Sequence, residues 1–403
     1  MKFSLLTLMY IFLYALIPTL SSAQEHSPLQ YSCGGDLSQW RQNLENEAKS
    51  AGISDHAIQQ LAKAKIDQRV VARDRSQTIF NLSFAEFSKK ILSHARFEKG
   101  KEQLKRNQNL FQSAEETYGV PGAVITAIWG LETDYGAIQG NLNTLDALFT
   151  LSYDCRRPEV FRPQLIALLK LFDKGVINAR STGAWAGEIG QMQLLPKDYL
   201  EIGVDGDKDG KIDLKNSVPD AIMTAAHMLN KLGWHRGDPW LEPVLITRDI
   251  SWQQTGRTFK KPRHQWLRAG IKPLGLHNQN YQGDASLLLP MGRHGPAFLA
   301  YDNFDIFLKW NKSSVYATTV AYFAARLDGD PAFVLDNPEP GLSTSELLEL
   351  QKMLSERGYN IGKIDGILGA ATRESVRQEQ IILNMPADSW PTQELLAKLK
   401  DKQ

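Results

Sequence analysis

The sequence lacks the residues and motifs of several common catalytic classes. It has two cysteines in 403 residues, which is too few for a zinc site built from cysteine thiolates. It contains no His-Glu-x-x-His motif, no Cys-x-x-Cys pair, no phosphate-binding loop and no Gly-x-Ser-x-Gly turn. These absences argue against the metalloproteases, dithiol oxidoreductases, nucleotide hydrolases and serine hydrolases that such motifs define.

An excess of charge of either sign is also missing. Lysine and arginine number 46, aspartate and glutamate 45, and the net charge is +1. Charged residues are 23% of the chain and hydrophobic residues 42%, which is typical of a globular protein and not of a disordered or strongly basic one. We therefore expect a monomer without a nucleic-acid partner, and the length suggests two or three domains.

Long apolar runs are absent except at the N-terminus. Lys2 precedes an uncharged, mostly apolar stretch over residues 3–20, and small residues at 21–23 are followed by Gln24. This pattern predicts a secretory signal peptide over residues 1–23, although the run is about long enough to be a membrane anchor instead. We expect an exported, soluble periplasmic protein with no membrane span after signal cleavage.

Export bears on the two cysteines, Cys33 and Cys155. In an oxidising compartment they could pair, and the alternative is two free buried thiols. We expect the disulfide, which would close a long loop.

The chain divides into a large region and a small one. Helical periodicity dominates residues 37–327, where alternating runs of β-branched residues are few. Two prolines, a glycine and two acidic residues predict a linker over residues 336–341. We therefore expect a mainly α domain over residues 24–335 and a compact helical domain over residues 342–403.

The small region has clear helix signals. Ser343 and Glu346 have the spacing of a capping box. A helix follows, with Leu347, Leu350, Gln351 and Leu354 along it, and Gly358 ends it. A glycine-rich turn then leads to another helix that starts near Thr372.

One carboxylate stands out, in the segment Trp-Gly-Leu-Glu-Thr-Asp-Tyr-Gly at residues 129–136. Periodicity puts Glu132 on the same helical face as Ile125 and Ile128. Burial there would raise the pKa of Glu132 and make it a usable general acid for a glycosidic bond. The spacing by itself favours a plainer alternative, a glutamate that only caps or pairs at a helix end. Asp134 should point nearly the opposite way, so any second reacting group would come from the substrate.

A glycine-rich segment follows at residues 183–196, Gly-Ala-Trp-Ala-Gly-Glu-Ile-Gly-Gln-Met-Gln-Leu-Leu-Pro. Its glycines allow close approach of the backbone to a ligand. Gln193 could offer both a donor and an acceptor to a sugar amide or hydroxyl. A tightly packed turn is the alternative interpretation.

A third motif has the spacing of a calcium-binding loop. Loop positions 1, 3, 5 and 9 are Asp205, Asp207, Asp209 and Asp213, and position 6 is a glycine. Position 7 would contribute the carbonyl of Lys211. Position 12 is Asn216 where glutamate is usual, so we expect Asp220 to close the site instead. Aspartate-rich turns also occur without metal, and we expect any bound Ca²⁺ to be structural.

These motifs occur together and in one order, and with them the chain resembles the B-type lytic murein transglycosylases from about Cys33 to Leu327. The segment at residues 129–136 looks like that family's catalytic-glutamate motif. The glycine-rich segment and the aspartate loop are similar to its cleft segment and its EF-hand-like insertion. Trp-Asn-Lys-Ser at residues 310–313, with Tyr316, resembles its late motif near the active site.

The resemblance implies a fold and a set of roles. The fold would be mainly α, a lysozyme-like helical catalytic domain with an EF-hand-like loop, followed by a small three-helix peptidoglycan-binding domain. Glu132 would be the acid and base, and Tyr135, Gln193, Asn311 and Tyr316 would bind the substrate. Peptidoglycan glycan strands would be the partner. No cofactor would be needed for the chemistry, and a structural Ca²⁺ is expected.

Two other functions remain open at this point. A lysozyme-type hydrolase would use the same acid with water as the nucleophile, and it requires a second carboxylate across the cleft. Glu188 is the unusual candidate, because many relatives of the resembled family carry a small residue there. A non-catalytic wall-binding protein would rely on residues 342–403, but the intact motif around Glu132 argues against it.

Overall fold

The structure is a computed structural model that describes residues 31–75, 82–335 and 337–401. The expected signal peptide over residues 1–23 lies outside the described residues, as does the first residue of the expected linker. None of the helices in the described ranges is both long and apolar enough to cross a membrane.

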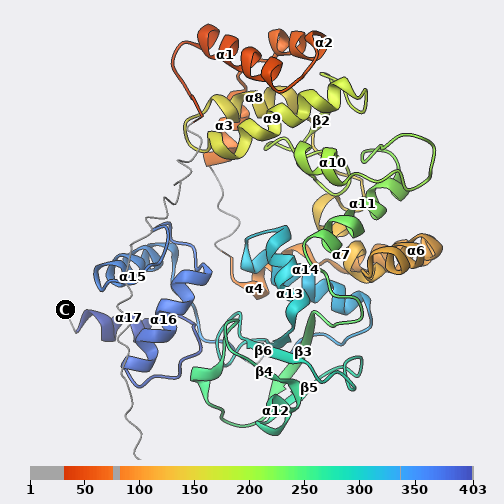
Figure 1. Cartoon of the computed structure of the whole chain (residues 1–403). Coiled ribbons are helices and arrows are strands. Elements are labelled where there is room, and N and C mark those ends of the chain that lie inside the picture. The colour runs from red at the N-terminus through yellow and green to blue at the C-terminus, as the bar shows by residue number, and fades with distance from the viewer. Residues whose placement is uncertain (1–30, 76–81, 336, 402–403) are drawn as a thin grey trace, which may run out of the picture.

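Helices dominate the described chain, so the prediction of a mainly α fold is confirmed (Figure 1). The first eight helices, apart from α7, which is described below, are α1 (Leu37–Ser50), α2 (Asp55–Ile58), α3 (Gln68–Arg75), α4 (Phe84–Ile91), α5 (His94–Arg106), α6 (Gln108–Tyr118) and α8 (Thr144–Tyr153). Next come α9 (Pro158–Asp173), α10 (Pro196–Ile202), α11 (Val218–Lys231), α12 (Arg263–Arg268), α13 (Asp302–Trp310) and α14 (Ser314–Leu327). Short 3-10 turns lie at Gln59–Lys63 and Trp252–Gln254.

Helix α7 (Gly122–Thr133) lies at the centre of the main core. It packs against α14, α5, α6 and α11. Ile125 and Ile128 are fully buried, and most of the helix surface is covered by its neighbours. Pro121 is the residue before the first helical turn rather than within it.

A five-stranded antiparallel sheet interrupts the helices, and the sequence analysis did not foresee it. Its strands are β3 (Leu241–Ile246), β4 (Lys260–Pro262), β5 (Ile271–Pro273), β6 (Asp284–Leu288) and β7 (Ala297–Ala300), in the order β4-β6-β7-β3-β5. All of β7 and the first four residues of β3 are buried, so neither strand alternates between polar and apolar residues. The strands β4 and β5, which end in proline, lie at the two edges of the sheet, where a missing N–H is tolerated.

A two-stranded ribbon brings the start of α8 to the glycine-rich segment. Strand β1 (Leu142–Asn143) pairs with β2 (Thr182–Gly183), and Asn143 lies opposite Thr182. The ribbon therefore fixes one end of residues 183–196 against the helical core.

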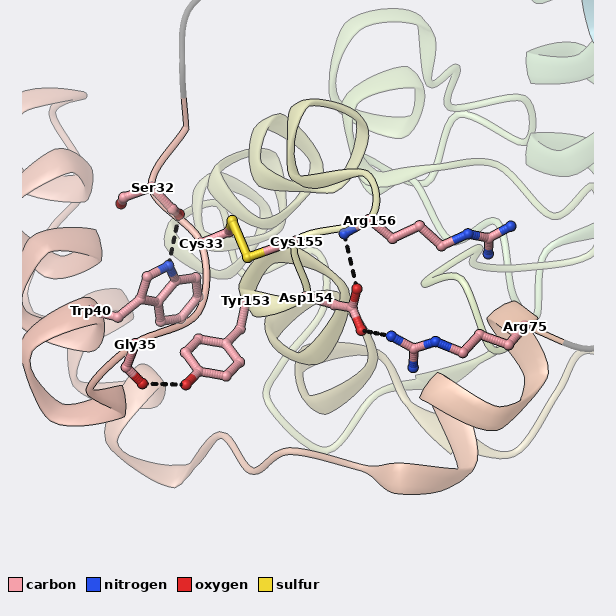
Figure 2. Close-up of a disulfide and its surroundings, with 9 residues drawn as sticks. All are labelled: Ser32, Cys33, Gly35, Trp40, Arg75, Tyr153, Asp154, Cys155 and Arg156. Carbon is pink, nitrogen blue, oxygen red and sulfur yellow. Dashed lines mark hydrogen bonds and ion pairs between the residues drawn. A yellow bond between two sulfur atoms is a disulfide. The ribbon is translucent and has the colours of Figure 1, made fainter. Parts of the chain in front are cut away.

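The two cysteines form a disulfide that ties the chain before α1 to the loop between α8 and α9 (Figure 2). The Cα atoms of Cys33 and Cys155 are 5.1 Å apart. Local hydrogen bonds support the same junction, including one from the Trp40 indole to the carbonyl of Ser32 at 2.9 Å. The bridge closes a loop across 122 positions of sequence.

The C-terminal helices have a core of their own and lie beside the sheet (Figure 1). They are α15 (Thr344–Glu356), α16 (Ala370–Ile382) and α17 (Gln393–Lys400). Ser343 and Glu346 form both hydrogen bonds of the capping box at the start of α15, which confirms that prediction. Helix α16 begins two residues before the expected Thr372, which is buried.

Candidate active site

Glu132 occupies the last turn of α7, where its carboxylate meets two donors from distant parts of the chain. The Trp310 indole N–H donates to Oε1 at 3.0 Å, and the Tyr316 hydroxyl donates to the same oxygen. Trp310 ends α13 and Tyr316 lies in the first turn of α14. Because both described hydrogen bonds go to Oε1, Oε2 is the oxygen that can carry a proton outwards.

The surroundings of Glu132 favour its protonated form. Burial raises the pKa of this half-buried carboxyl to about 7, against the opposing effect of the hydrogen bonds from Tyr316 and Trp310. The negative charge of Glu188 adds to the rise. Burial and the charge of Glu132 also raise the pKa of Tyr316 well above its ordinary value, so this hydroxyl remains a donor. A carboxyl that titrates near neutrality can both give and take a proton.

Asp134, two residues further on, has the opposite electrostatic setting. Burial would raise its pKa, but hydrogen bonds and charge from Lys99 and Arg96 outweigh burial and hold the pKa below its ordinary value. The ion pairs join Asp134 to Arg96 Nε and to Lys99 Nζ, each at 3.2 Å. Asp134 therefore remains ionised and is paired with Arg96 and Lys99.

The backbone directly after α7 is unusual. Asp134 and Tyr135 have φ angles of 52° and 62°, in the left-handed region that non-glycine residues rarely adopt, and Gly136 follows at 83°. Such a run persists only when its surroundings hold it, and it ends the helix directly after Glu132. Gly136 is thus three residues past Thr133, the last helical residue.

Tyr135 is buried with its hydroxyl bonded to the backbone, and its binding of substrate stays a prediction. Its side chain is 7% exposed and packs edge-on against Trp129. Its hydroxyl donates to the carbonyl of Arg96 at 2.7 Å. The positive φ angle turns this ring into the core, so Tyr135 supports α7 from behind.

Gln193 lies in the glycine-rich segment with a φ angle of 52°. Its amide N–H₂ donates to the carbonyls of Gly190 at 2.8 Å and Gln139 at 3.3 Å. The half-buried side chain therefore already shapes the loop from within.

Glu188 is a second half-buried carboxylate near the first. Burial raises its pKa, while hydrogen bonds from backbone N–H groups, including that of Ala186 at 3.1 Å, and the charge of Arg157 act against the rise. Like Glu132, Glu188 thus has its pKa raised by burial, and its charge acts on Glu132.

A cavity of about 1780 Å³ lies between the helical domain and the C-terminal helices. Trp185 and Glu188 line it from the glycine-rich segment, and Asn311 lines it from the junction of α13 and α14. Residues 366–370 line it from the C-terminal helices. Glu132 and Tyr316 are not among the residues that line this cavity. Glu188 does line it, and its negative charge acts on Glu132.

Sequence reasoning left two residues of this site out of its list, the half-buried Trp310 and the buried Gln191. Trp310 was part of a quoted motif but received no role, although its indole contacts the Glu132 carboxylate. Gln191 was likewise only part of the glycine-rich motif, yet it accepts a hydrogen bond from the Trp129 indole at 3.0 Å. The sequence offered one signal for Gln191: a polar residue in a segment expected to be buried needs a hydrogen-bond partner.

The aspartate loop, residues 205–213, brings three carboxylates together. Oxygen atoms of Asp205, Asp207 and Asp209 lie within 4.8 Å of one another, the one such acidic group in the described ranges. Gly210 at loop position 6 has a φ angle of 88°, which only glycine adopts without cost. The donor set is oxygen alone, which fits Ca²⁺.

Two of the expected ligands have other contacts. Asp220 is 1% exposed, and its two oxygens accept the backbone N–H groups of Gly206 at 2.8 Å and Asp213 at 2.6 Å. Asp213 accepts from the side-chain amide of Asn216 at 2.8 Å. Asp220 therefore closes the loop through hydrogen bonds to its backbone, and direct binding of a metal by Asp220 stays a prediction.

Family comparisons agree with this arrangement of elements. A family model described as the transglycosylase SLT domain matches residues 36–325, and a model of a peptidoglycan binding domain matches residues 343–399. Membrane-bound lytic murein transglycosylase B of Escherichia coli (strain K12) is 31% identical over 246 residues, which are 60% of this chain and 66% of that protein. The chain thus spans slightly less than two thirds of that relative.

Solved structures give the same picture. SltB3 from Pseudomonas aeruginosa in complex with NAG-anhNAM-pentapeptide superposes with a TM-score of 0.81 at 35% identity, covering 91% of this chain and 100% of that one. Lytic transglycosylase Slt35 of Escherichia coli in complex with calcium superposes with a TM-score of 0.61 at 26% identity, covering 74% of this chain and 96% of that one.

Proposed function

Since the chain belongs to the transglycosylase SLT domain family, we propose that it is a lytic murein transglycosylase. It cleaves the β-1,4 bond between N-acetylmuramic acid and N-acetylglucosamine and leaves 1,6-anhydro-muramyl ends. The observation that carries this proposal is a single carboxyl, Glu132, whose pKa is raised to about 7 by burial while Trp310 and Tyr316 hold its Oε1.

One residue suffices because the substrate supplies the nucleophile. Glu132 gives its proton to the glycosidic oxygen as the bond from that oxygen to the muramyl C1 breaks. The ionised Glu132 then takes the proton of the muramyl C6 hydroxyl, whose oxygen forms the new bond to C1. The proton count of Glu132 is restored and no water is consumed. An intramolecular hydroxyl reacts at a high effective concentration, so it outcompetes bulk water.

Substrate contacts follow from the walls of the cavity. Asn311 lies on the wall, and Gln193 helps to shape the loop beside it. Tyr316 acts through the Glu132 carboxylate. Tyr135 is buried with its hydroxyl held by the backbone, and its binding of substrate stays a prediction.

The aspartate loop binds a structural Ca²⁺. Asp205, Asp207 and Asp209 supply the clustered oxygens, and the Lys211 carbonyl and Asp213 complete the set that the loop spacing requires. Calcium supplies no step of the chemistry here; it holds the loop in its folded shape. The E. coli Slt35 complex with calcium supports a site of this kind in the family.

The C-terminal helices hold the enzyme on the wall. The family match at residues 343–399 supports peptidoglycan as their ligand. Removing residues 342–403 should weaken binding to whole sacculi, measured by sedimentation, and leave cleavage of soluble fragments. Loss of turnover on soluble fragments would show that the two parts do not act independently.

The protein acts in the periplasm after loss of residues 1–23. The pairing of Cys33 with Cys155 supports this compartment, because disulfides persist there. N-terminal sequencing of the mature protein should begin near Gln24. A soluble cytoplasmic protein that retains Met1 and two alkylatable thiols would contradict export.

A hydrolase is the rival that one observation favours. Glu188 is a second carboxylate near Glu132, and a hydrolase requires such a second carboxylate to activate a water molecule. Mass analysis of the products from purified peptidoglycan separates the two reactions. Anhydro ends are lighter than hydrated ends by one water, so hydrated ends from the wild-type protein would assign it to the hydrolases.

A further inference from the structure

The glycine-rich segment contains a buried glutamine that the proposed chemistry does not use. Gln191 is 4% exposed. A buried amide is costly unless it is hydrogen-bonded, so its partners indicate what it does. The partner of the side-chain amide is the Trp129 indole, and the backbone N–H and carbonyl of Gln191 make further hydrogen bonds, so the residue contacts two separate parts of the site.

The first partner is the end of α7. The Trp129 indole N–H donates to Gln191 Oε1 at 3.0 Å, and the Thr133 hydroxyl donates to the Gln191 carbonyl at 2.7 Å. Trp129 and Thr133 are one helical turn apart and flank Glu132 in sequence. Thr133 also accepts the N–H of Gly136 at 2.9 Å, so the same contact steadies the chain that leaves the helix.

The second partner is the chain that follows the aspartate loop. The Gln191 N–H donates to the carbonyl of Leu214 at 2.8 Å. Leu214 is buried and directly follows Asp213, the last residue of the aspartate loop. A parallel contact runs from the Gln139 side chain to the carbonyl of Lys215 at 2.9 Å. Gln191 is therefore bonded to both the aspartate loop and the catalytic helix.

We infer that Gln191 is a positioning residue for Glu132, and that it connects the aspartate loop to the last turn of α7. This inference rests on the proposed function, because it takes Glu132 to be the reacting group. It assigns no chemistry to Gln191 itself. The last turn of α7 is followed by a left-handed run, so its place is set by contacts from outside the helix. Gln191 fixes that turn relative to Trp310 and Tyr316, whose donors must meet the Glu132 carboxylate.

The effect of losing this contact falls on turnover. A displacement of a reacting group by about 1 Å can lower the rate by about a hundredfold. Gln191→Met keeps the length of the side chain and removes the acceptor of the Trp129 indole. We expect kcat to fall roughly tenfold to a hundredfold, while KM for soluble muropeptide chains changes less than about twofold, because Gln191 does not touch substrate.

A double variant separates positioning from simple stability. Gln191→Met alone leaves the Trp129 indole buried without a partner, which is destabilising, whereas Gln191→Met with Trp129→Phe removes both polar groups and can be nearly neutral. We expect the Tm to recover partly in the double variant and kcat to stay low. A kcat that recovers with the Tm would overturn the inference.

Gln164→Met is the matched control. Gln164 is also a buried glutamine, on α9, and its Oε1 accepts the N–H of Lys197 at 2.9 Å, whereas that of Gln191 accepts from α7. Its loss should lower the Tm and leave kcat unchanged. Equal losses of kcat in Gln164→Met and Gln191→Met would reduce Gln191 to an ordinary core residue.

The link to the aspartate loop has a readout that does not depend on activity. Hydrogen exchange of the Gln191 amide and of the Trp129 indole N–H can be followed by NMR in Ca²⁺ and in chelator. We expect both to exchange faster in chelator, because the Leu214 carbonyl is fixed by the folded loop. Unchanged exchange would overturn the link.

The outcomes distinguish this inference from the proposed function. Wild-type protein that releases no anhydro ends would overturn the function, whatever Gln191 does. Normal release of anhydro ends by both the wild type and Gln191→Met would overturn the positioning role alone.

Discussion

The end of α7 and the aspartate loop both gather carboxylates, and they treat them in opposite ways. Glu132 is half-buried, receives two hydrogen bonds at one oxygen, and has its pKa raised to about 7 by burial. Asp207 and Asp209 are exposed, and with Asp205 they hold their oxygens close together. One region isolates a carboxyl to keep a proton, and the other concentrates carboxylates that would repel without a cation.

The comparison shows that side-chain identity does not decide the chemistry of an acid. Withdrawal from water favours the neutral form, whereas clustered charge in water favours binding of a cation. The two regions also differ in what they need from the rest of the chain. The aspartate loop is made from neighbours in sequence, while Glu132 depends on Trp310 and Tyr316 from positions 178 and 184 residues away.

The largest expected effect comes from replacing Glu132 by a residue that cannot give and take a proton. Glu132→Gln keeps the shape of the side chain but cannot cycle a proton. Proton transfer contributes about 10²–10⁴-fold, and here one residue serves both steps, so turnover should fall by at least about a thousandfold. Release of anhydromuropeptides is the measurement, with binding to sacculi as the check that the fold survives. Near-normal release would remove Glu132 from the mechanism.

The next largest effect concerns the other region. Calcium that binds only the folded loop stabilises the protein by about 2.7 kcal/mol at a hundredfold excess over Kd. The Tm should therefore rise by roughly 5 °C between chelator and millimolar Ca²⁺. The double variant Asp207→Asn, Asp209→Asn should lose this shift, and Glu201→Gln, an exposed acid outside the cluster, should keep it. A wild-type Tm that is the same in chelator and in millimolar Ca²⁺ would show that the loop binds no calcium.

A smaller effect concerns the pH dependence of turnover. The acid must be protonated, so kcat should fall as pH rises above about 7, the pKa to which burial raises Glu132. Tyr316→Phe removes a hydrogen bond that favours the ionised form, and this should raise the pKa and move the alkaline limb to higher pH. Glu188→Gln removes a negative charge and should move the limb to lower pH.

We expect each shift to change the relative rate at pH 8 by about threefold to tenfold. Limbs that move the same way in both variants would contradict this assignment of causes.

The raised pKa of Glu132 also affects stability, because the folded state holds the proton more tightly than the unfolded chain. The contribution of Glu132 to stability should therefore be lost as pH rises from about 4.5 to about 7.

Local signals were predictable from the sequence, and non-local ones were not. The capping box of Ser343 and Glu346 spans three residues, so its geometry follows from spacing alone. The sheet was missed because β3 and β7 are buried on both faces and have no alternation to detect. Periodicity cannot reveal such strands, since a short apolar run fits a buried helix equally well.

The candidate site shows the same division. Helical phase indicated that Glu132 faces apolar neighbours, but no pattern within α7 could reveal that Trp310 and Tyr316 share its Oε1. Tyr135 was assigned to substrate because it lies in the motif. The direction of its side chain is set by a φ angle of 62°. Helical periodicity cannot predict that direction, because the helix ends at Thr133.

The smallest expected effect concerns Asp134, and it tests the comparison most closely because this acid is two residues from Glu132. Asn is the matched substitution, since it also tolerates the left-handed backbone that Asp134 adopts at a φ angle of 52°. Asp134→Asn loses the ion pairs with Arg96 and Lys99, whose side chains are 22% and 36% exposed, and such pairs contribute only about 0–1 kcal/mol. The Tm should fall slightly, and turnover should fall less than about threefold, because the lowered pKa of Asp134 keeps it ionised and unable to donate a proton at neutral pH. A loss of a hundredfold or more with an unchanged Tm would instead make Asp134 a second catalytic carboxylate and return the reaction to the hydrolases.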